Sequence, residues 1–196
     1  NYSPDGAVNF KYTDVVAAMQ QGNTAIIMEG APLGGRINDP EKSTVRGKLG
    51  YAMVPKGPGG RHPAFTGHGV ALAAGAPNLE PAWLFLQWAL SKDTTIDIAL
   101  NSNHVAVSRD SVWEDASFRE KWNLPGAGGD FLKAFQDSLN AADANYRPRI
   151  SGWGEVNTAY GEALQKVMLG QISAEEAMND AQAKAVEVMK RLEYID

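Results

Sequence analysis

The chain has 196 residues, of which 44% are apolar and 21% charged, the profile of a soluble globular protein, and its net charge of −5 excludes a basic nucleic-acid-binding surface. It has no cysteine, which excludes disulfides, thiolate metal sites and cysteine nucleophiles. No apolar run approaches the roughly 18 residues that a membrane span requires. The opening residues, Asn1 to Gly6, are typical of a loop rather than of a signal peptide, so we expect part of a longer protein.

Short β-rich runs alternate with amphipathic segments along the chain, which predicts an α/β fold. The predicted strands cover residues 24–28, 49–54, 67–74 and 105–107. The predicted helices cover residues 14–21, 78–90, 93–100, 111–122 and 129–142, with Pro125-Gly126 between the last two, and then two C-terminal helices. Four tryptophans lie in helical patterns and are expected in the core: Trp83, Trp88, Trp113 and Trp122.

The two C-terminal helices have the clearest pattern. Gly170 is expected to end the first, and Ser173 with Glu176 forms a capping box that starts the second. The inner face of the first is predicted to consist of Val156, Ala159, Tyr160, Ala163, Leu164, Val167 and Met168. That of the second is predicted to consist of Ala177, Met178, Ala181, Ala185, Val188, Met189 and Leu192.

Four ordered segments resemble the family 1 extracellular solute-binding proteins. "FKYTDVVAAMQQGNTAIIMEG" resembles that family's helix followed by a strand that ends in glycine, and "KLGYAMVPKGPGG" resembles its strand with a proline-glycine loop. "FTGHGVALAAGAPNLEPAWLFLQWALSKD" resembles its crossover strand and Ala-Trp helix. "YRPRISGWGEVNTAYGEALQKVMLGQISAEEAMNDA" resembles its C-terminal helix pair. Together they cover essentially the whole chain.

The resemblance implies the C-terminal part of a two-lobe, periplasmic binding protein type II-like α/β fold, with the ligand held between the lobes. Residues 1–66 would belong to the C-terminal lobe, residues 67–107 would cross the hinge and complete the N-terminal lobe, and residues 108–196 would return. It also implies a non-enzymatic receptor that delivers a sugar or polyol to ABC permease subunits. Such a receptor is periplasmic or lipid-anchored outside the cytoplasm, is monomeric at full length and needs no cofactor.

Glu29 and Gly30 follow a predicted buried strand, where a carboxylate could accept hydrogen bonds from sugar hydroxyls and a glycine lets backbone approach a ligand. Glu29 could equally cap local backbone N–H groups. The family often places a tryptophan just after this glycine, whereas here Ala31, Pro32 and Leu33 follow. The missing stacking platform favours a small sugar or polyol over a long oligosaccharide.

Five further residues match the family's cleft and hinge positions. Phe65 and Trp153 could stack on a ligand, Thr66 and His68 could bond its hydroxyls, and the guanidinium of Arg109 suits vicinal hydroxyls. Structural alternatives remain for four of them: Phe65 could belong to the core, His68 could be a hydrogen-bonded structural histidine, Arg109 could be a surface or helix-dipole residue, and Trp153 could pack at the hinge.

Two other classes of function are considered. A carbohydrate-active lyase or hydrolase is the main alternative, but adjacent carboxylates such as Glu175-Glu176 face different directions on a helix, and no motif supports catalysis. The three histidines are too scattered to indicate a metal site. A helix-rich interaction module is the second alternative, and ligand-induced stabilisation would distinguish it from a binding protein.

Overall fold

The computed structural model describes residues 2–124 and 131–196, so the predicted Pro125-Gly126 turn lies outside the described residues. The chain forms two compact units: a larger unit of residues 1–4 and 11–144, and a smaller unit of residues 5–10 and 145–196.

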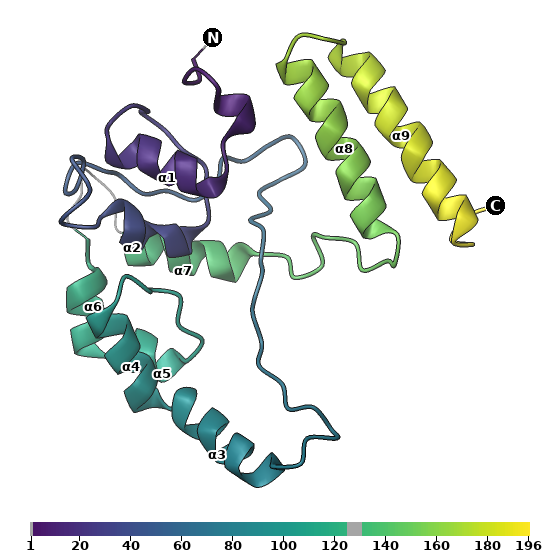
Figure 1. Ribbon diagram of the computed structural model, residues 1–196. Coiled ribbons are helices and arrows are strands. Elements are labelled where there is room, and N and C mark those ends of the chain that lie inside the picture. Colours follow the sequence, from purple (N-terminus) through teal and green to yellow (C-terminus); the bar gives the residue numbers. More distant parts are fainter. Residues whose placement is uncertain (1, 125–130) are drawn as a thin grey trace. The chain divides into compact units, whose positions relative to one another are not determined.

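The larger unit is helical in its described part (Figure 1). Its α-helices are α1 (Tyr12–Gln20), α2 (Gly34–Ile37), α3 (Leu79–Ala89), α4 (Lys92–Asn101), α5 (Asp110–Trp113), α6 (Ala116–Trp122) and α7 (Phe131–Ala141), and a 3-10 turn, η2 (Ala31–Leu33), precedes α2. Local signals set several ends. Gly22 adopts a left-handed conformation directly after α1, and Asp115 caps α6 by accepting hydrogen bonds from the backbone of Ser117 and Phe118.

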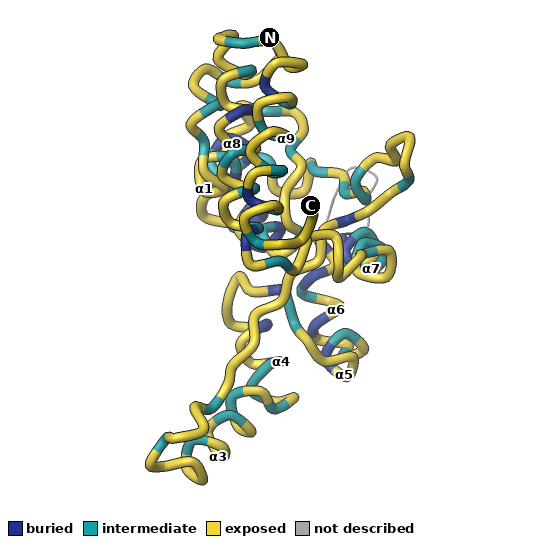
Figure 2. Tube along the Cα trace, turned by 90° about the vertical axis from the view of Figure 1, so that its right-hand side faces the viewer, coloured by how far each residue is buried: buried dark blue, intermediate teal, exposed yellow. Residues whose placement is uncertain are grey.

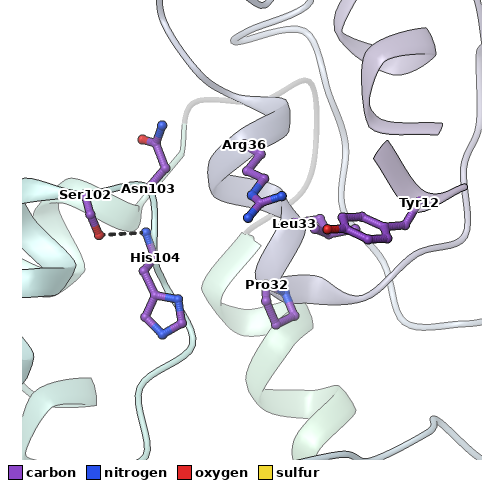
Figure 3. A pocket seen from close by; sticks show the side chains of 7 residues that line it. All are labelled: Tyr12, Pro32, Leu33, Arg36, Ser102, Asn103 and His104. Carbon is purple, nitrogen blue, oxygen red and sulfur yellow. Dashed lines mark hydrogen bonds between the residues drawn. The ribbon is translucent and has the colours of Figure 1, made fainter. Parts of the chain in front are cut away.

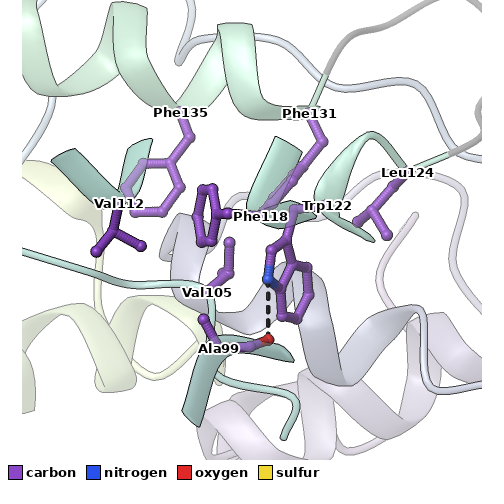
Figure 4. Packing of buried hydrophobic residues seen from close by; sticks show 8 residues of the cluster. All are labelled: Ala99, Val105, Val112, Phe118, Trp122, Leu124, Phe131 and Phe135. Atoms are coloured by element: carbon purple, nitrogen blue, oxygen red, sulfur yellow. Dashed lines mark hydrogen bonds between the residues drawn. The ribbon is translucent and has the colours of Figure 1, made fainter. Parts of the chain in front are cut away.

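An aromatic cluster forms the main core of this unit (Figure 4). Phe118 is fully buried and meets Trp113 edge-on, with ring centroids 5.5 Å apart. Trp122 is 2% exposed, and its indole N–H donates to the carbonyl of Ala99 at 3.2 Å, which joins α6 to α4. The cluster consists of Ala99, Val105, Val112, Phe118, Trp122, Leu124, Phe131 and Phe135. The prediction that Trp122 lies in the core is therefore confirmed, and Trp113 is partly buried against the same cluster.

The predicted strands are not paired strands in the described residues. Residues 24–28, 49–54, 67–74 and 105–107 contain neither helix nor paired strand, and the isolated bridges in the described part join Gly57 to Gly60 and Ala64 to Asp143. A strand is stabilised by the backbone groups of a neighbouring strand, and these segments meet none here. Their β-forming sequences therefore do not form a sheet among the described residues.

Most residues of helix α3 are exposed (Figure 2), including tryptophans that its periodicity placed in the core. Trp83 is 55% exposed and Trp88 is 61% exposed, so the prediction that they are buried is wrong for this structure. The helix forms as predicted, and Ala82, Leu86 and Ala89 are partly buried. Amphipathic spacing identifies an apolar face but does not supply the surface that covers it.

The smaller unit is a helical hairpin preceded by a short 3-10 turn. It consists of η1 (Ala7–Asn9), α8 (Trp153–Met168) and α9 (Ala174–Arg191). Gly170, with a φ of 69°, follows the end of α8, and the Ser173 hydroxyl accepts from the backbone N–H of Glu176 at 3.1 Å, so both predicted boundaries are confirmed.

Packing within the hairpin confirms one predicted stripe fully and the other in part. Every residue of the predicted inner face of α9 is buried or partly buried. On α8, the predicted residues that are buried or partly buried are Val156, Ala159, Ala163 and Val167, whereas Tyr160, Leu164 and Met168 are exposed. Helix α8 therefore contacts α9 along a narrower stripe than its apolar pattern suggested.

Candidate functional site

Glu29 and Gly30 lie in an exposed extended segment that leads into η2. The carboxylate of Glu29 accepts a hydrogen bond from the backbone N–H of Gly30 at 3.1 Å, which matches the alternative of local capping. Gly30 has a φ of −62°, and a Cβ there would make ordinary contact with Pro32. No local strain therefore requires a glycine at this position.

Phe65, Thr66 and His68 lie on the extended segment that leads toward α3, and all three are exposed (Figure 1). Phe65 is 44% exposed and is not part of the core clusters formed by the described residues. The alternative that Phe65 is a core residue is therefore not supported here.

Arg109 lies just before α5 and is exposed. Its Nε donates to the carbonyl of Leu90 at 2.5 Å, and Leu90 is the residue that ends α3. A cation at a helix C-terminus satisfies a carbonyl without an intrahelical partner and interacts favourably with the helix dipole. This contact gives Arg109 the structural role that was weighed against ligand binding.

Trp153 is the first residue of α8 in the smaller unit and is partly buried. Beside it, Gly152 is buried so tightly that a Cβ would lie 2.5 Å from a methyl group of Val188. The glycine before Trp153 therefore serves the packing of α8 on α9.

A pocket of about 440 Å³ opens on the larger unit (Figure 3). It is lined by Tyr12, Pro32, Leu33, Arg36, Ser102, Asn103 and His104. One wall is formed by η2 and α2, together with the first residue of α1, and the other by the turn after α4. None of the seven predicted site residues lines this pocket, although Glu29 and Gly30 directly precede its first wall.

The turn at residues 102–104 is held by several hydrogen bonds. The hydroxyl of Ser102 donates to the carbonyl of Ile98 at 2.6 Å and accepts from the backbone N–H of His104 at 3.1 Å. Lys121 donates to the carbonyls of Leu100 and Ser102 at 2.6 and 2.7 Å, and desolvation by burial lowers the pKa of its amine. These hydrogen bonds fix the backbone of this wall, and the side chain of His104 lines the pocket.

The opposite wall is anchored through Asn38, which follows α2 and is 4% exposed. Its amide nitrogen donates to the carbonyl of Gly34 at 2.8 Å and to the hydroxyl of Tyr51 at 2.6 Å. Burial raises the pKa of Tyr51, and the hydrogen bond from Asn38 offsets part of that rise. In the sequence, Arg36 lies between the buried residues Gly35 and Ile37, but it is itself exposed and lines the pocket.

The pocket combines groups that suit a polyhydroxylated ligand. The guanidinium of Arg36 can donate two parallel hydrogen bonds to neighbouring hydroxyls, and the imidazole and amide of His104 and Asn103 can each donate or accept. The ring of Tyr12, 54% exposed, offers an apolar face with a hydroxyl at its tip. Aromatic and apolar lining with a few polar groups is typical of small-molecule sites.

Sequence reasoning did not find Tyr12, Arg36 or His104 as site residues. The available signal was their position: Arg36 follows the same glycine loop as Glu29, and His104 lies between a helix and a β-rich run. In the described residues, no group of three or more His, Asp or Glu side chains is placed to hold a metal ion. No helix among them has the length and apolar character needed to cross a membrane.

Comparisons with known proteins place these features in context. Residues 1–96 match the model of the bacterial extracellular solute-binding proteins. A binding protein of Brucella abortus strain 2308 is 25% identical over 187 residues, which cover 95% of this chain and 42% of that protein. The mannitol-binding protein of Pseudomonas aeruginosa is 22% identical over an alignment that covers 98% of this chain and 46% of that protein.

The fold has a match among solved structures. An ABC transporter solute-binding protein of Agrobacterium radiobacter K84, solved in complex with ribitol, superposes with a TM-score of 0.78 at 25% identity, over 94% of this chain and 45% of that one. The chain thus spans less than half the length of the proteins that it matches here. Residues 1–96 thus match the bacterial extracellular solute-binding protein family in sequence, and the fold of the chain is similar to that of a solved solute-binding protein.

Proposed function

We propose that this chain forms one side of the ligand cleft of an ABC-importer receptor for a small sugar or polyol. The observation that carries the proposal is the structural match over 94% of the chain to a solute-binding protein solved with ribitol. A relative named for mannitol binding supports the same class of ligand. The pocket at Arg36 supplies hydroxyl-binding groups on the same chain.

The lobe assignment follows from this proposal. Residues 1–66 and 108–196 would belong to the C-terminal lobe of a type II α/β fold, and residues 67–107 would cross to the N-terminal lobe. The exposed apolar face of α3 supports a covering partner, because Trp83, Phe85 and Trp88 are each at least 55% exposed. Strand neighbours for residues 24–28 would come from the sheet of the C-terminal lobe, and those for residues 67–74 from the sheet of the N-terminal lobe.

We assign the pocket as the main ligand contact that this chain contributes: its wall at Arg36 would belong to the C-terminal lobe, and its wall at Asn103 and His104 to the segment that crosses the hinge. Arg36, Asn103 and His104 would bond hydroxyls, and Tyr12 would contact the carbon chain. Glu29 and Gly30 would extend this surface, because they lead directly into the wall at η2. Phe65, Thr66, His68, Arg109 and Trp153 would contribute from segments near the hinge.

Ligand capture would proceed by closure of the two lobes, and the closed form would dock on ABC permease subunits. This function places the protein outside the cytoplasm, periplasmic or lipid-anchored, as a monomer at full length. Binding of this kind requires no cofactor and no bond cleavage in the ligand.

The test uses the native polypeptide, meaning this chain with whatever sequence flanks it in the cell. A ligand that binds only the folded state stabilises it by about 2.7 kcal/mol at one hundred times its Kd. Ribitol or mannitol should therefore raise the melting temperature, with chromatography showing the ligand unchanged afterwards. If no sugar or polyol raises the melting temperature, the proposed function is wrong, and conversion of the ligand would instead indicate an enzyme.

A further inference from the structure

Two consecutive glycines begin α2, and both are buried. A Cβ on Gly34 would collide with the ring of Phe131, which is a side chain of the core cluster. A Cβ on Gly35 would collide with the backbone carbonyl oxygen of Asn103 and would lie 2.9 Å from the ring of Trp122. Gly34 therefore meets the core alone, whereas Gly35 meets both the core and the far wall of the pocket.

The contact at Gly35 joins the two walls of the pocket. Gly35 lies on α2 directly before Arg36, and Asn103 lies at the centre of the opposing turn (Figure 3). A second contact crosses the same gap, because the Asn103 amide donates to the carboxylate of Asp39 at 3.1 Å. The walls are thus held together at one backbone contact and one side-chain hydrogen bond.

The turn at Asn103 cannot move away without losing other contacts. Its neighbour Ser102 is bonded to Ile98 through the side chain and to Lys121 through the carbonyl. A flexible side chain could rotate to admit a methyl group at Gly35, but a backbone carbonyl held on both sides moves only with its whole turn. Any larger residue at this position therefore separates the turn from α2.

We infer that Gly35 is a positioning residue that sets the separation of the two pocket walls and thereby the size of ligand that the pocket accepts. The part of this inference that concerns ligand size rests on the proposed function, whereas the part that concerns the separation of the walls does not. Gly35 itself need not touch the ligand: it determines how far the guanidinium of Arg36 lies from Asn103 and His104. A ligand that bridges these groups is recognised only when their spacing matches its hydroxyls.

A distance measurement without ligand tests the first part. Residues 1–196 contain no cysteine, so Arg36→Cys and His104→Cys, in a native polypeptide whose flanking sequence has any cysteine replaced by serine, give one pair of spin labels across the pocket. Dipolar electron paramagnetic resonance should show a longer distance when Gly35→Ala is added. Gly34→Ala, the matched control, should lower the melting temperature by disturbing Phe131 but leave the distance unchanged. An unchanged distance in Gly35→Ala overturns the inference, as does an equal increase in Gly34→Ala.

Ligand selectivity tests the second part, without the labels. Gly35→Ala should weaken ribitol binding by about tenfold, a typical effect of misfit in a pocket, and weaken mannitol, the longer ligand, by less. Gly34→Ala should leave the ratio of the two dissociation constants unchanged. An unchanged ratio in Gly35→Ala overturns the role in selectivity. If Gly35→Ala does not fold, Asp39→Ala removes the second tie and should lengthen the label distance, and its failure to do so counts against the inference. If the unsubstituted protein binds neither polyol, the proposed function fails, while the label distances still decide the role of Gly35.

Discussion

Replacing Phe118 by alanine tests whether the aromatic cluster stabilises the larger unit. The side chain is fully buried and packs edge-on against Trp113. Phe118 lies in the first turn of α6, next to Ser117, and its backbone N–H donates to the cap residue Asp115. Deleting a buried phenylalanine ring typically costs about 3–5 kcal/mol, because transfer free energy is lost and a cavity remains. We expect a loss near the lower bound, because neighbouring Trp113 is only partly buried and can relax toward the cavity.

Urea unfolding followed by tryptophan fluorescence is the appropriate assay, since Trp122 lies in the cluster and Trp113 packs against it. The midpoint should fall with an unchanged m-value, which would show that the surface exposed on unfolding is the same. Phe118→Leu, which retains most of the volume, should cost less than about 1.5 kcal/mol. A loss below about 1 kcal/mol for Phe118→Ala would be typical of a surface site and would refute the assignment of this cluster as the core.

Three further substitutions test local contacts. Tyr51→Phe should cost about 1 kcal/mol by removing the hydrogen bond from Asn38. The pKa of Tyr51 is raised above 10.0 in the folded state, so the unfolded state loses this proton first and the free energy of unfolding falls as pH rises above 10. In urea titrations at alkaline pH, Tyr51→Phe should therefore lose stability less steeply than the unsubstituted protein. An equally steep loss would contradict the burial of this hydroxyl. Asp115→Ala should lower the unfolding free energy by about 1 kcal/mol through loss of the α6 cap, whereas no change in the urea midpoint would show that the cap contributes nothing. Gly152→Ala should destabilise the α8–α9 pair by about 1–3 kcal/mol, because its methyl group overlaps Val188, and unchanged amide exchange along α9 would rule out this overlap.

Elements held by contacts near in sequence could be predicted from the residues alone. The predicted inner face of α9 agrees with the structure at every residue, because its partner α8 is separated from it by one short turn and the Ser173 cap is a local signal. The end of α1 at Gly22 was similarly local. The failure at Trp83 and Trp88 has the opposite cause, since their burial depends on a surface that local sequence does not specify.

The candidate site shows the same division. The glycine loop at Glu29 was recognised from its sequence, and it leads into one wall of the pocket. The opposite wall at His104 could not be recognised, because it is held near Arg36 by tertiary contacts: the close approach of Gly35 to the Asn103 backbone and the hydrogen bond from Asn103 to Asp39. Such a contact between distant segments depends on tertiary packing and leaves no periodic pattern in the sequence.

Calorimetric titration of the native polypeptide with ribitol tests the central claim most directly, through a pair of matched arginine variants. Arg36 lines the pocket, whereas Arg46 is exposed elsewhere on the same unit. Arg36→Ala should weaken binding by about tenfold or more, the loss expected for a hydrogen bond from a charged group, and Arg46→Ala should leave the affinity unchanged. Equal affinities for the two variants would contradict the assignment of this pocket as the ligand-binding wall.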